Sequence, residues 1–451
     1  GSETPTARIT INSSGDFIIN STGGTLQTAT AGTSNFRAGV NAGNSIQSGG
    51  NYNTVVGDEA GTALTTGDNN VAIGFEALKT EDAHGENVAV GYQALKTQNA
   101  GASGLNVAVG YKTGTAVTTG IRNTLMGGLA GDVLTDADFN TALGYAALSS
   151  DTLGSKSVAL GYSALEAQNF TTATDSFNVA VGYEAGHVVT TGTRNTIIGG
   201  LAGDALTTGS FNTAFGYAAL STEDTAHNNT ALGYATLTTL NGGTQNVAVG
   251  QSAAAAMTTG NQNTIIGTNA GDALTDADQN VAIGYLALTA DTLGSTSTAI
   301  GYNTLADQNF TTATSTYNTA VGYNAGGAVT TGVGNTIVGG LAGDALTEGQ
   351  YNSVLGRSAL SAATTGSFNV ALGSFSLLSN TTGADNVSVG YDSLANNTTA
   401  SYNTAVGRNA LKTNILGSKS VALGFSALEA QNFTTATDSY NTAVGYEAGE
   451  S

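Results

Sequence analysis

One short pattern of polar and apolar residues recurs along almost the whole chain. In its clearest copy, residues 441–449, it reads Asn-Thr-Ala-Val-Gly-Tyr-Glu-Ala-Gly. We align 24 copies, and the spacing between their first residues is 17 almost everywhere. A short period kept over so long a chain is typical of a solenoid, in which each coil packs only on its neighbours. The copies begin at residues 35, 53, 70, 87, 106, 123, 140, 157, 178, 195, 212, 229, 246, 263, 280, 297, 318, 335, 352, 369, 386, 403, 420 and 441.

The positions of one coil, numbered 1 to 17 from its first residue, predict a short strand followed by a turn. Position 4 is apolar in every copy, position 3 is mostly alanine, and position 5 is glycine throughout. Positions 2 to 4 therefore predict a strand whose aliphatic residue at position 4 lies in the core, together with leucine from position 9 or 12. Since neighbouring strand residues face opposite sides, the alanine at position 3 is expected outside. A frequent Thr-Thr-Gly motif at positions 13 to 15 predicts a second short strand and turn.

Two further positions carry polar and aromatic rows. Position 1 is asparagine in 21 copies and serine in three, Ser157, Ser297 and Ser420. Equal positions lie above one another in a parallel stack, so these amides are expected to form a structural, hydrogen-bonded ladder. All 17 tyrosines lie at position 6 or 17, where they either stack on one another or present a binding strip. The ladder residues that represent the row are Asn195, Asn212, Asn229, Asn246, Asn263 and Asn280.

Residues 1–34 precede the first copy and form a separate segment. Residues 7–12 and 16–20 alternate between polar and apolar around a Ser-Ser-Gly sequence, which predicts a hairpin. We expect this segment to cap the first coil, because an open strand edge promotes aggregation, and residues 35–451 to form the β-solenoid domain. The last copy stops at its eleventh position with no cap after it, which predicts that a longer chain or another subunit continues the stack end to end.

Composition and charge exclude several classes of function. The chain has 32 acidic and 12 basic residues, and no lysine or arginine lies between Arg194 and Arg357. This balance argues against nucleic-acid binding, which needs cationic side chains at the phosphates. The absence of cysteine removes disulfides and thiolate chemistry. No apolar run reaches the roughly 18 residues of a membrane-spanning helix, so no membrane span is predicted.

Carboxylates and histidines are the candidate chemical groups. Carboxylates that recur at equivalent positions are best interpreted as turn or cap residues, with Ca²⁺ binding as the second interpretation. Catalysis is the third, because a glycosidase needs two carboxylates in different environments. The three histidines, His84, His187 and His227, lack metal-ligand spacing and a nucleophile partner, which predicts a surface role. No cofactor is therefore expected, with Ca²⁺ as the alternative. The carboxylates are Asp132, Asp204, Asp272 and Asp344 in Ala-Gly-Asp sequences and the pairs Asp136/Asp138 and Asp276/Asp278.

Three coils carry a four-residue insertion with the same sequence, Gln-Asn-Phe-Thr-Thr-Ala-Thr. The insertions occupy residues 168–174, 308–314 and 431–437. A loop with an aromatic ring beside amides suits stacking on a sugar and hydrogen bonding to it. The alternative is a bulge whose phenylalanine packs back onto the body. The receptor-contact candidates are Asn169, Phe170, Asn309, Phe310, Asn432 and Phe433.

The repeat resembles two known families. Its core phrase, Asn-Thr/Val/Ser-Ala-Val/Ile-Gly, is similar to the head repeat of trimeric autotransporter adhesins, although the 17-residue coil is longer. The fuller form, with Tyr-x-Ala-Leu and Thr-Thr-Gly, resembles the shaft repeats of bacteriophage tail fibres. The likeness covers residues 35–451. It implies a trimeric fibre on a virion or a bacterial cell surface that binds a cell-surface receptor, and it transfers no catalytic residue.

The sequence therefore predicts an all-β, left-handed parallel β-roll of about 24 coils. Its expected role is a non-enzymatic, extracellular fibre shaft or adhesin that presents contact loops to a cell-surface glycan. An exposed row of small apolar residues at position 3 would exceed the apolar patch of a soluble monomer, which predicts a homotrimer, with a dimer as the alternative. Two other functions stay open. A polysaccharide-degrading tail spike would need a non-repeated acidic pair, and an ice-binding solenoid would need threonine in every coil of one face.

Overall fold

The computed structural model describes residues 9–11, 17–19, 31–222 and 225–450. Within these residues the chain is an all-β parallel solenoid of about 24 coils with a repeat of roughly 17 residues. This confirms the predicted fold class, whereas the handedness of the coil and the homotrimer stay predictions. None of the described residues forms a helix of the length and apolarity needed to cross a membrane.

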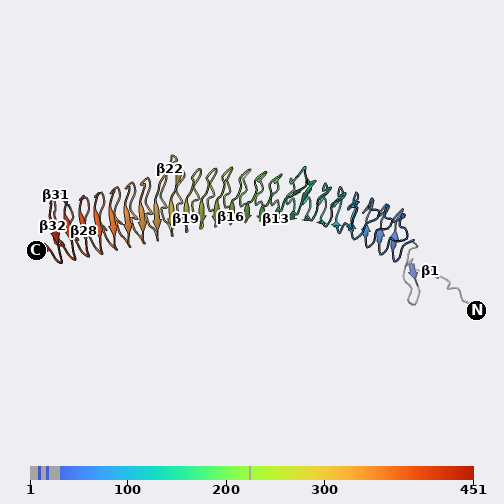
Figure 1. Ribbon diagram of the computed structural model, residues 1–451, viewed down its shortest axis with the longest axis horizontal. Coiled ribbons are helices and arrows are strands. Elements are labelled where there is room, and N and C mark those ends of the chain that lie inside the picture. The colour runs from blue at the N-terminus through green and yellow to red at the C-terminus, as the bar shows by residue number, and fades with distance from the viewer. Residues whose placement is uncertain (1–8, 12–16, 20–30, 223–224, 451) are drawn as a thin grey trace, which may run out of the picture. The chain divides into compact units, whose positions relative to one another are not determined.

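The coils belong to two compact units. The first is Gly1–Ser157 with Asn169–Thr174, and the second is Val158–Gln168 with Asp175–Ser451. Each coil contributes one three-residue strand at its positions 2 to 4, and within each unit the strands of successive coils follow one another as a row of short arrows (Figure 1). The strands of the first unit are β3 (Phe36–Ala38), β4 (Thr54–Val56), β5 (Val71–Ile73), β6 (Val88–Val90), β7 (Val107–Val109), β8 (Thr124–Met126) and β9 (Thr141–Leu143). The strands of the second unit are β11 (Val158–Leu160), β13 (Val179–Val181), β14 (Thr196–Ile198), β15 (Thr213–Phe215), β16 (Thr230–Leu232), β17 (Val247–Val249), β18 (Thr264–Ile266), β19 (Val281–Ile283), β21 (Thr298–Ile300), β23 (Thr319–Val321), β24 (Thr336–Val338), β25 (Ser353–Leu355), β26 (Val370–Leu372), β27 (Val387–Val389), β28 (Thr404–Val406), β30 (Val421–Leu423) and β32 (Thr442–Val444).

Strands of adjacent coils pair in parallel and in register within each unit. Between β18 and β19, Thr264 lies opposite Val281 and Ile266 lies opposite Ile283. The backbone N–H of Thr264 donates to the Asn280 carbonyl at 2.8 Å, which joins the two coils at the start of the strand. Because equal positions face each other, a residue type that recurs at one position forms a continuous row along the unit.

The side of the strand that faces the core is opposite to the predicted one. Ala282 and Ile265, at position 3, are 0% and 1% exposed, whereas Leu143 and Phe215, at position 4, are 47% and 49% exposed. The prediction that position 4 fills the core was therefore wrong, and so was the exposed row at position 3 from which the homotrimer was predicted. The buried asparagine at position 1 explains the reversal, because alternation along a strand places position 3 on its side and positions 2 and 4 on the other.

Positions 3 and 9 fill the same space inside the coil. Where position 3 is small, as at Ala142, position 9 is Leu148, and both are fully buried. Where position 3 is large, as at Ile197, position 9 is Gly203, and a Cβ built there would lie 3.2 Å from the Ile197 Cδ1. The alanine at position 3 is thus small because leucine reaches across from position 9. In other coils positions 3 and 9 are both small, as at Ala180 and Gly186. Side chains of the neighbouring coils fill the space there, since a Cβ built on Gly186 would lie 3.0 Å from Ile197 Cδ1 and 3.1 Å from Leu165 Cδ2, as close packing requires.

Left-handed residues turn the chain within each coil. Gly267, at position 5, has φ of 140°, and a Cβ there would lie 2.4 Å from the carbonyl oxygen of Gly284 in the next coil. The glycine at position 5 is therefore required by the close approach of two turns. Leu148, at position 9, also adopts a positive φ, of 57°. That conformation costs about 1–2 kcal/mol for a residue with a side chain, and complete burial of the leucine contributes about 1.5–3 kcal/mol in return.

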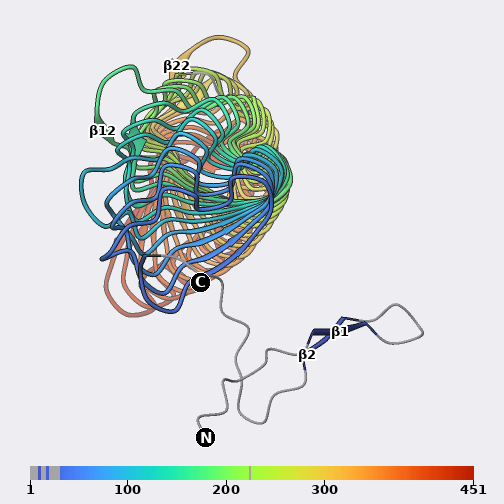
Figure 2. The ribbon, with the colours of Figure 1, turned by 90° about the vertical axis from the view of Figure 1, so that its right-hand side faces the viewer.

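The second strand predicted for every coil appears only beside the insertions. Elsewhere in the described residues positions 13 to 15 form bends or irregular backbone, although coils still join there through bonds such as Thr258 N–H to the Thr275 carbonyl at 2.9 Å. Figure 2 shows the loop next to β22 extending beyond the neighbouring coils of its unit. The second strands are β10 (Gly154–Ser155), β12 (Thr174–Asp175), β20 (Gly294–Ser295), β22 (Thr314–Ser315), β29 (Gly417–Ser418) and β31 (Thr437–Asp438).

The N-terminal segment contains a short hairpin. Strands β1 (Ile9–Ile11) and β2 (Phe17–Ile19) pair antiparallel, with Ile9 opposite Ile19. The rest of the predicted segment up to residue 30 lies outside the described residues. That residues 1–34 cap the solenoid stays a prediction.

Candidate functional site

The asparagines at position 1 form a row of hydrogen bonds inside the stack. The Asn246 Oδ1 accepts a bond from the backbone N–H of Asn263 at 3.0 Å, and the Asn263 side-chain amide donates to the Ala277 carbonyl at 2.7 Å. The six representative asparagines all make this pair of contacts and are at most 1% exposed. The row is therefore enclosed by protein and offers no surface to a ligand.

A glutamine completes the row where serine replaces asparagine. The Gln308 side-chain amide donates to Ser297 Oγ at 2.8 Å, and the Gln308 Oε1 accepts from the Asn318 side chain at 2.9 Å. Gln431 makes the equivalent contact with Ser420, at 3.1 Å. The sequence carries a signal for this role, because each of the three serines at position 1 opens a coil with an insertion. The insertions thus begin with a structural residue that sequence reasoning missed.

The insertions place two of their phenylalanines against the body, which corrects the receptor-contact prediction for Phe170 and Phe310. These residues are 5% and 7% exposed, and the Phe310 backbone N–H donates to the buried Asp291 Oδ1 at 3.1 Å. Gly154 leaves room for the Phe170 ring, since a Cβ on that glycine would lie 2.8 Å from the ring. A buried ring cannot stack on a sugar. Of the other candidates, Phe433 is half-buried, and Asn169, Asn309 and Asn432 are exposed.

The four Ca²⁺ candidates are not brought together. Asp132, Asp204, Asp272 and Asp344 occupy position 10 of coils that lie four repeats apart. Burial raises the pKa of Asp132, Asp204 and Asp344 above the ordinary range, and Asp272 accepts a bond from Thr289 Oγ1 at 2.5 Å. A Ca²⁺ ion takes six to eight oxygen ligands. Each carboxylate would therefore need most of its ligands from other groups, and Ca²⁺ binding stays a prediction.

The acidic pairs bind the turn of the neighbouring coil. Asp278 Oδ1 accepts from the Asn261 backbone N–H at 2.7 Å, and Asp276 Oδ1 accepts from Thr259 Oγ1 at 2.7 Å. Asp136 and Asp138 make the equivalent contacts with the preceding coil. Both pairs thus serve the turn role that the sequence favours.

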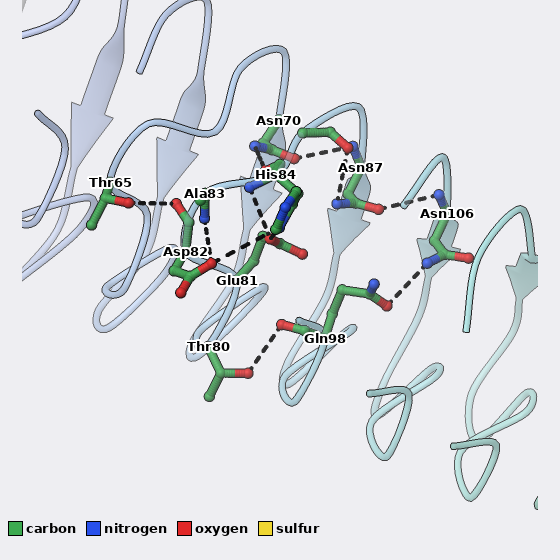
Figure 3. Close-up of polar contacts among 11 residues, drawn as sticks. Thr65, Asn70, Thr80, Glu81, Asp82, Ala83, His84, Asn87, Gln98 and Asn106 are labelled. Carbon is green, nitrogen blue, oxygen red and sulfur yellow. Dashed lines mark hydrogen bonds and ion pairs between the residues drawn. The ribbon is translucent and has the colours of Figure 1, made fainter. Parts of the chain in front are cut away.

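One group of three possible metal ligands converges among the described residues. Glu81, Asp82 and His84 place their ligand atoms within 4.8 Å of one another (Figure 3). Burial raises the pKa of Glu81 to about 7. The His84 side chain is 28% exposed, and its surface role stays a prediction, but the convergence of the three groups was not predicted. The missed signal is a glutamate at position 12, where the preceding coil buries Leu64.

The other two histidines make contacts of a different kind. His187 Nε2 lies 3.5 Å from Glu166 Oε2 in a partly exposed pair. His227 Nδ1 accepts from the Ser210 backbone N–H at 2.9 Å. Neither histidine gathers two carboxylates among the described residues.

Glu76 lies at the centre of a separate ionic cluster. Lys79 Nζ lies 2.7 Å from Glu76 Oε1, and Lys96 Nζ lies 2.6 Å from Glu76 Oε2. The Gln93 side-chain amide donates to the same carboxylate at 2.8 Å. The bonds from Lys79 and Lys96 lower the pKa of Glu76 to about 2. The cluster joins two coils at positions 7 and 10 and is a stabilising contact.

The lowered pKa of Glu76 predicts how this residue affects the free energy of unfolding as the pH changes. Because the folded pKa lies below the ordinary value, the carboxylate stabilises the fold above about pH 4.5 and loses this effect as the pH falls towards 2. We expect Glu76→Gln to lower the free energy of unfolding at pH 7 by on the order of 1 kcal/mol, since both lysines are about a third exposed and screened by solvent. Urea unfolding at pH 7, 5, 4 and 3 should show the difference shrinking below pH 4.5. The exposed Glu348→Gln is the control, and a pH-independent difference would contradict the assignment.

The outer side of the strands carries exposed apolar residues, which we call the strand-face strip. Its aliphatic and phenylalanine members occupy position 4, and positions 6 and 17 flank the strand with aromatic residues. Rings at position 6 stack, with centroids 5.5 Å apart for Tyr285 and Tyr302 and 5.2 Å apart for Tyr302 and Tyr323. These tyrosines nevertheless stay 46–59% exposed, so they stack on one another and also present a surface. The most exposed position-4 members are Ile73, Met126 and Leu143 in the first unit and Phe215, Leu232, Ile266, Leu355, Val406, Leu423 and Val444 in the second.

Comparisons with known proteins neither support nor contradict the resemblance to adhesin and tail-fibre repeats. No protein family, no curated protein and no solved structure matches the chain. The functional argument therefore depends on the residues and geometry described above.

Proposed function

We propose that the protein is a non-enzymatic fibre shaft or adhesin whose chains associate as a homotrimer along the strand-face strip. The observation that carries the proposal is the strip itself. It places half-exposed aliphatic and aromatic side chains in parallel rows over successive coils of each unit, whereas monomeric proteins seldom expose more than a few hundred Å² of contiguous apolar surface.

A second copy of the chain is the partner that fits these rows. Only a partner with the same 17-residue spacing presents an apolar row opposite each row at every coil. Closed rotational symmetry would bury one strip from each chain without open-ended assembly. Each chain carries a net charge of −20, and position 4 is apolar in every copy. An interface centred on this row therefore keeps the repelling charges away from its middle.

The receptor class and the location follow from the resemblance to adhesin and tail-fibre repeats. We place the protein outside the cell, on a virion or a bacterial surface, with a cell-surface glycan as its receptor. In this proposal the glycan contacts the exposed amides of Asn169, Asn309 and Asn432 on the insertion loops. The buried phenylalanines Phe170 and Phe310 take no part in binding.

Two observations favour this function over its rivals. The recurring acidic pairs bond to neighbouring turns, which leaves them unsuited to the acid and nucleophile roles of a tail spike. The Thr275 and Thr347 hydroxyls donate to carbonyls of the next coil at 3.0 and 2.9 Å. The exposed threonine row at position 14 is interrupted by Asp136, Asp276 and Glu348, whereas an ice-binding face would present threonine in every coil.

The strip is tested by placing charges on it. Leu232→Glu combined with Ile266→Glu should shift the chain from trimer to monomer at micromolar concentration, because each interface would bury unpaired carboxylates. Thr208→Glu with Thr382→Glu, at exposed positions outside the strip, is the matched control. Sedimentation velocity measures both. A trimer that persists in the Leu232/Ile266 variant would show that the strip is not the interface.

A further inference from the structure

The third coil of the repeat carries an unusual set of side chains at its second turn. Positions 12, 13 and 15 are Glu81, Asp82 and His84, where the preceding coil has leucine, threonine and glycine. Glu81 is fully buried, and its Oε2 has no hydrogen-bond partner. The His84 Nδ1 is likewise buried without a hydrogen-bond partner. A buried carboxylate with an unpaired oxygen costs several kcal/mol unless a cation or a donor compensates it.

We propose that Glu81, Asp82 and His84 bind one divalent transition-metal ion, with Zn²⁺ as the ion that best matches the donors. His84 Nδ1 lies 3.5 Å from Glu81 Oε1 and 4.0 Å from Asp82 Oδ1. In a tetrahedral zinc site with bonds of about 2.0–2.1 Å, ligand atoms are about 3.3 Å apart. The spacing between Glu81 and His84 is close to this value, and the three ligand atoms all lie within 4.8 Å of one another. The partly exposed Asp82 side chain has room to move closer. Figure 3 shows the three side chains together on one turn.

The donor types separate zinc from the alkaline-earth ions. An imidazole nitrogen with two carboxylates suits Zn²⁺ and its neighbours in the first transition row. Ca²⁺ and Mg²⁺ prefer oxygen ligands alone, and Ca²⁺ needs six to eight of them. Three protein ligands leave a fourth position for water. His84 also lines a hollow of about 220 Å³ with Asp68 and Glu86, through which solvent reaches the turn.

The bound ion would stabilise the second turn of this coil. Position 12 is buried and apolar in many coils, as at Leu64 and Leu134, so Glu81 removes an apolar contact from the core of its coil. A metal bound between positions 12, 13 and 15 would hold the turn in place of that contact. It would also stabilise the folded chain in proportion to the logarithm of ion concentration over the dissociation constant.

The test measures Zn²⁺ binding to the full chain at neutral pH, with excess Mg²⁺ to occupy weak acidic sites. Isothermal titration calorimetry should show a site of one Zn²⁺ per chain. Glu81→Gln and His84→Ala should each weaken that site at least tenfold. The control is His187→Ala, which removes a histidine beside a single glutamate and should leave the affinity unchanged. Co²⁺ in place of Zn²⁺ should give visible absorption that disappears in the His84→Ala variant.

Two results would overturn the proposal. One is the absence of a saturable Zn²⁺ site in the unmodified chain, which needs no variant to fold. The other is unchanged affinity in Glu81→Gln and His84→Ala chains whose circular dichroism matches that of the unmodified protein. Glu81→Gln keeps the side-chain volume, so it separates loss of a ligand from loss of packing.

Discussion

Phe310→Ala is expected to lower the free energy of unfolding of the surrounding coils by about 3 kcal/mol. The ring is 7% exposed, and the truncation of a buried phenylalanine typically costs about 3–5 kcal/mol through lost burial and the cavity left behind. We expect a loss at the lower end of this energy range, because the Phe310 ring lies in a loop at the margin of the coil, where neighbouring residues relax more easily. The Phe310 N–H bond to Asp291 involves the backbone and is kept.

Hydrogen exchange of the coils around residues 297–318 measures this effect directly. Each coil of a solenoid interacts mainly with its neighbours, so the loss should be local and not global. Phe433→Ala, at the half-buried equivalent, should cost less, and Asn309→Ala, at an exposed residue, should cost almost nothing. Unchanged protection in Phe310→Ala would mean that the ring does not contribute to the core.

Asn263→Leu should destabilise its coil by about 1–3 kcal/mol, the cost of leaving buried polar groups without partners. The substitution removes the donor to the Ala277 carbonyl and the acceptor of the Asn280 N–H. Both contacts lie inside the stack, where water does not replace them. Leucine also adds apolar volume at a position that every coil reserves for an amide or a hydroxyl.

The matched control for the ladder is Gln262→Leu, the same replacement at the exposed residue next to it. Thermal unfolding followed by circular dichroism should show a lower midpoint for Asn263→Leu and an unchanged one for the control. Equal midpoints in both variants would show that the ladder adds no stability.

The periodic part of the fold could be predicted from the sequence, and the direction of its side chains could not. A repeat of 17 residues fixes which strands pair and in which register, and the asparagine at position 1 indicates a row of amides. The alanine at position 3 was misplaced because a small residue suits a crowded core as well as a close interface. The distinguishing signal is the asparagine at position 1, because a buried amide there places position 3 on the inner side of the strand.

The candidate sites were harder to predict because they depend on local exceptions to the repeat. The burial of Phe170 needs the gap that Gly154 leaves. The sequence alone does not indicate that these two residues lie next to each other. Glu81, Asp82 and His84 lie within four residues of one another, a spacing outside the usual metal motifs. Their convergence depends on a turn that points position 12 inward and brings position 15 back beside it.

The molar mass of the unmodified chain tests the central claim most directly. Static light scattering coupled to size exclusion, at micromolar concentration and physiological salt, distinguishes the states without a variant or a label. The proposed shaft predicts a stable species of three times 44.6 kDa. A stable monomer of 44.6 kDa would leave the strand-face strip exposed in solution and would contradict the account.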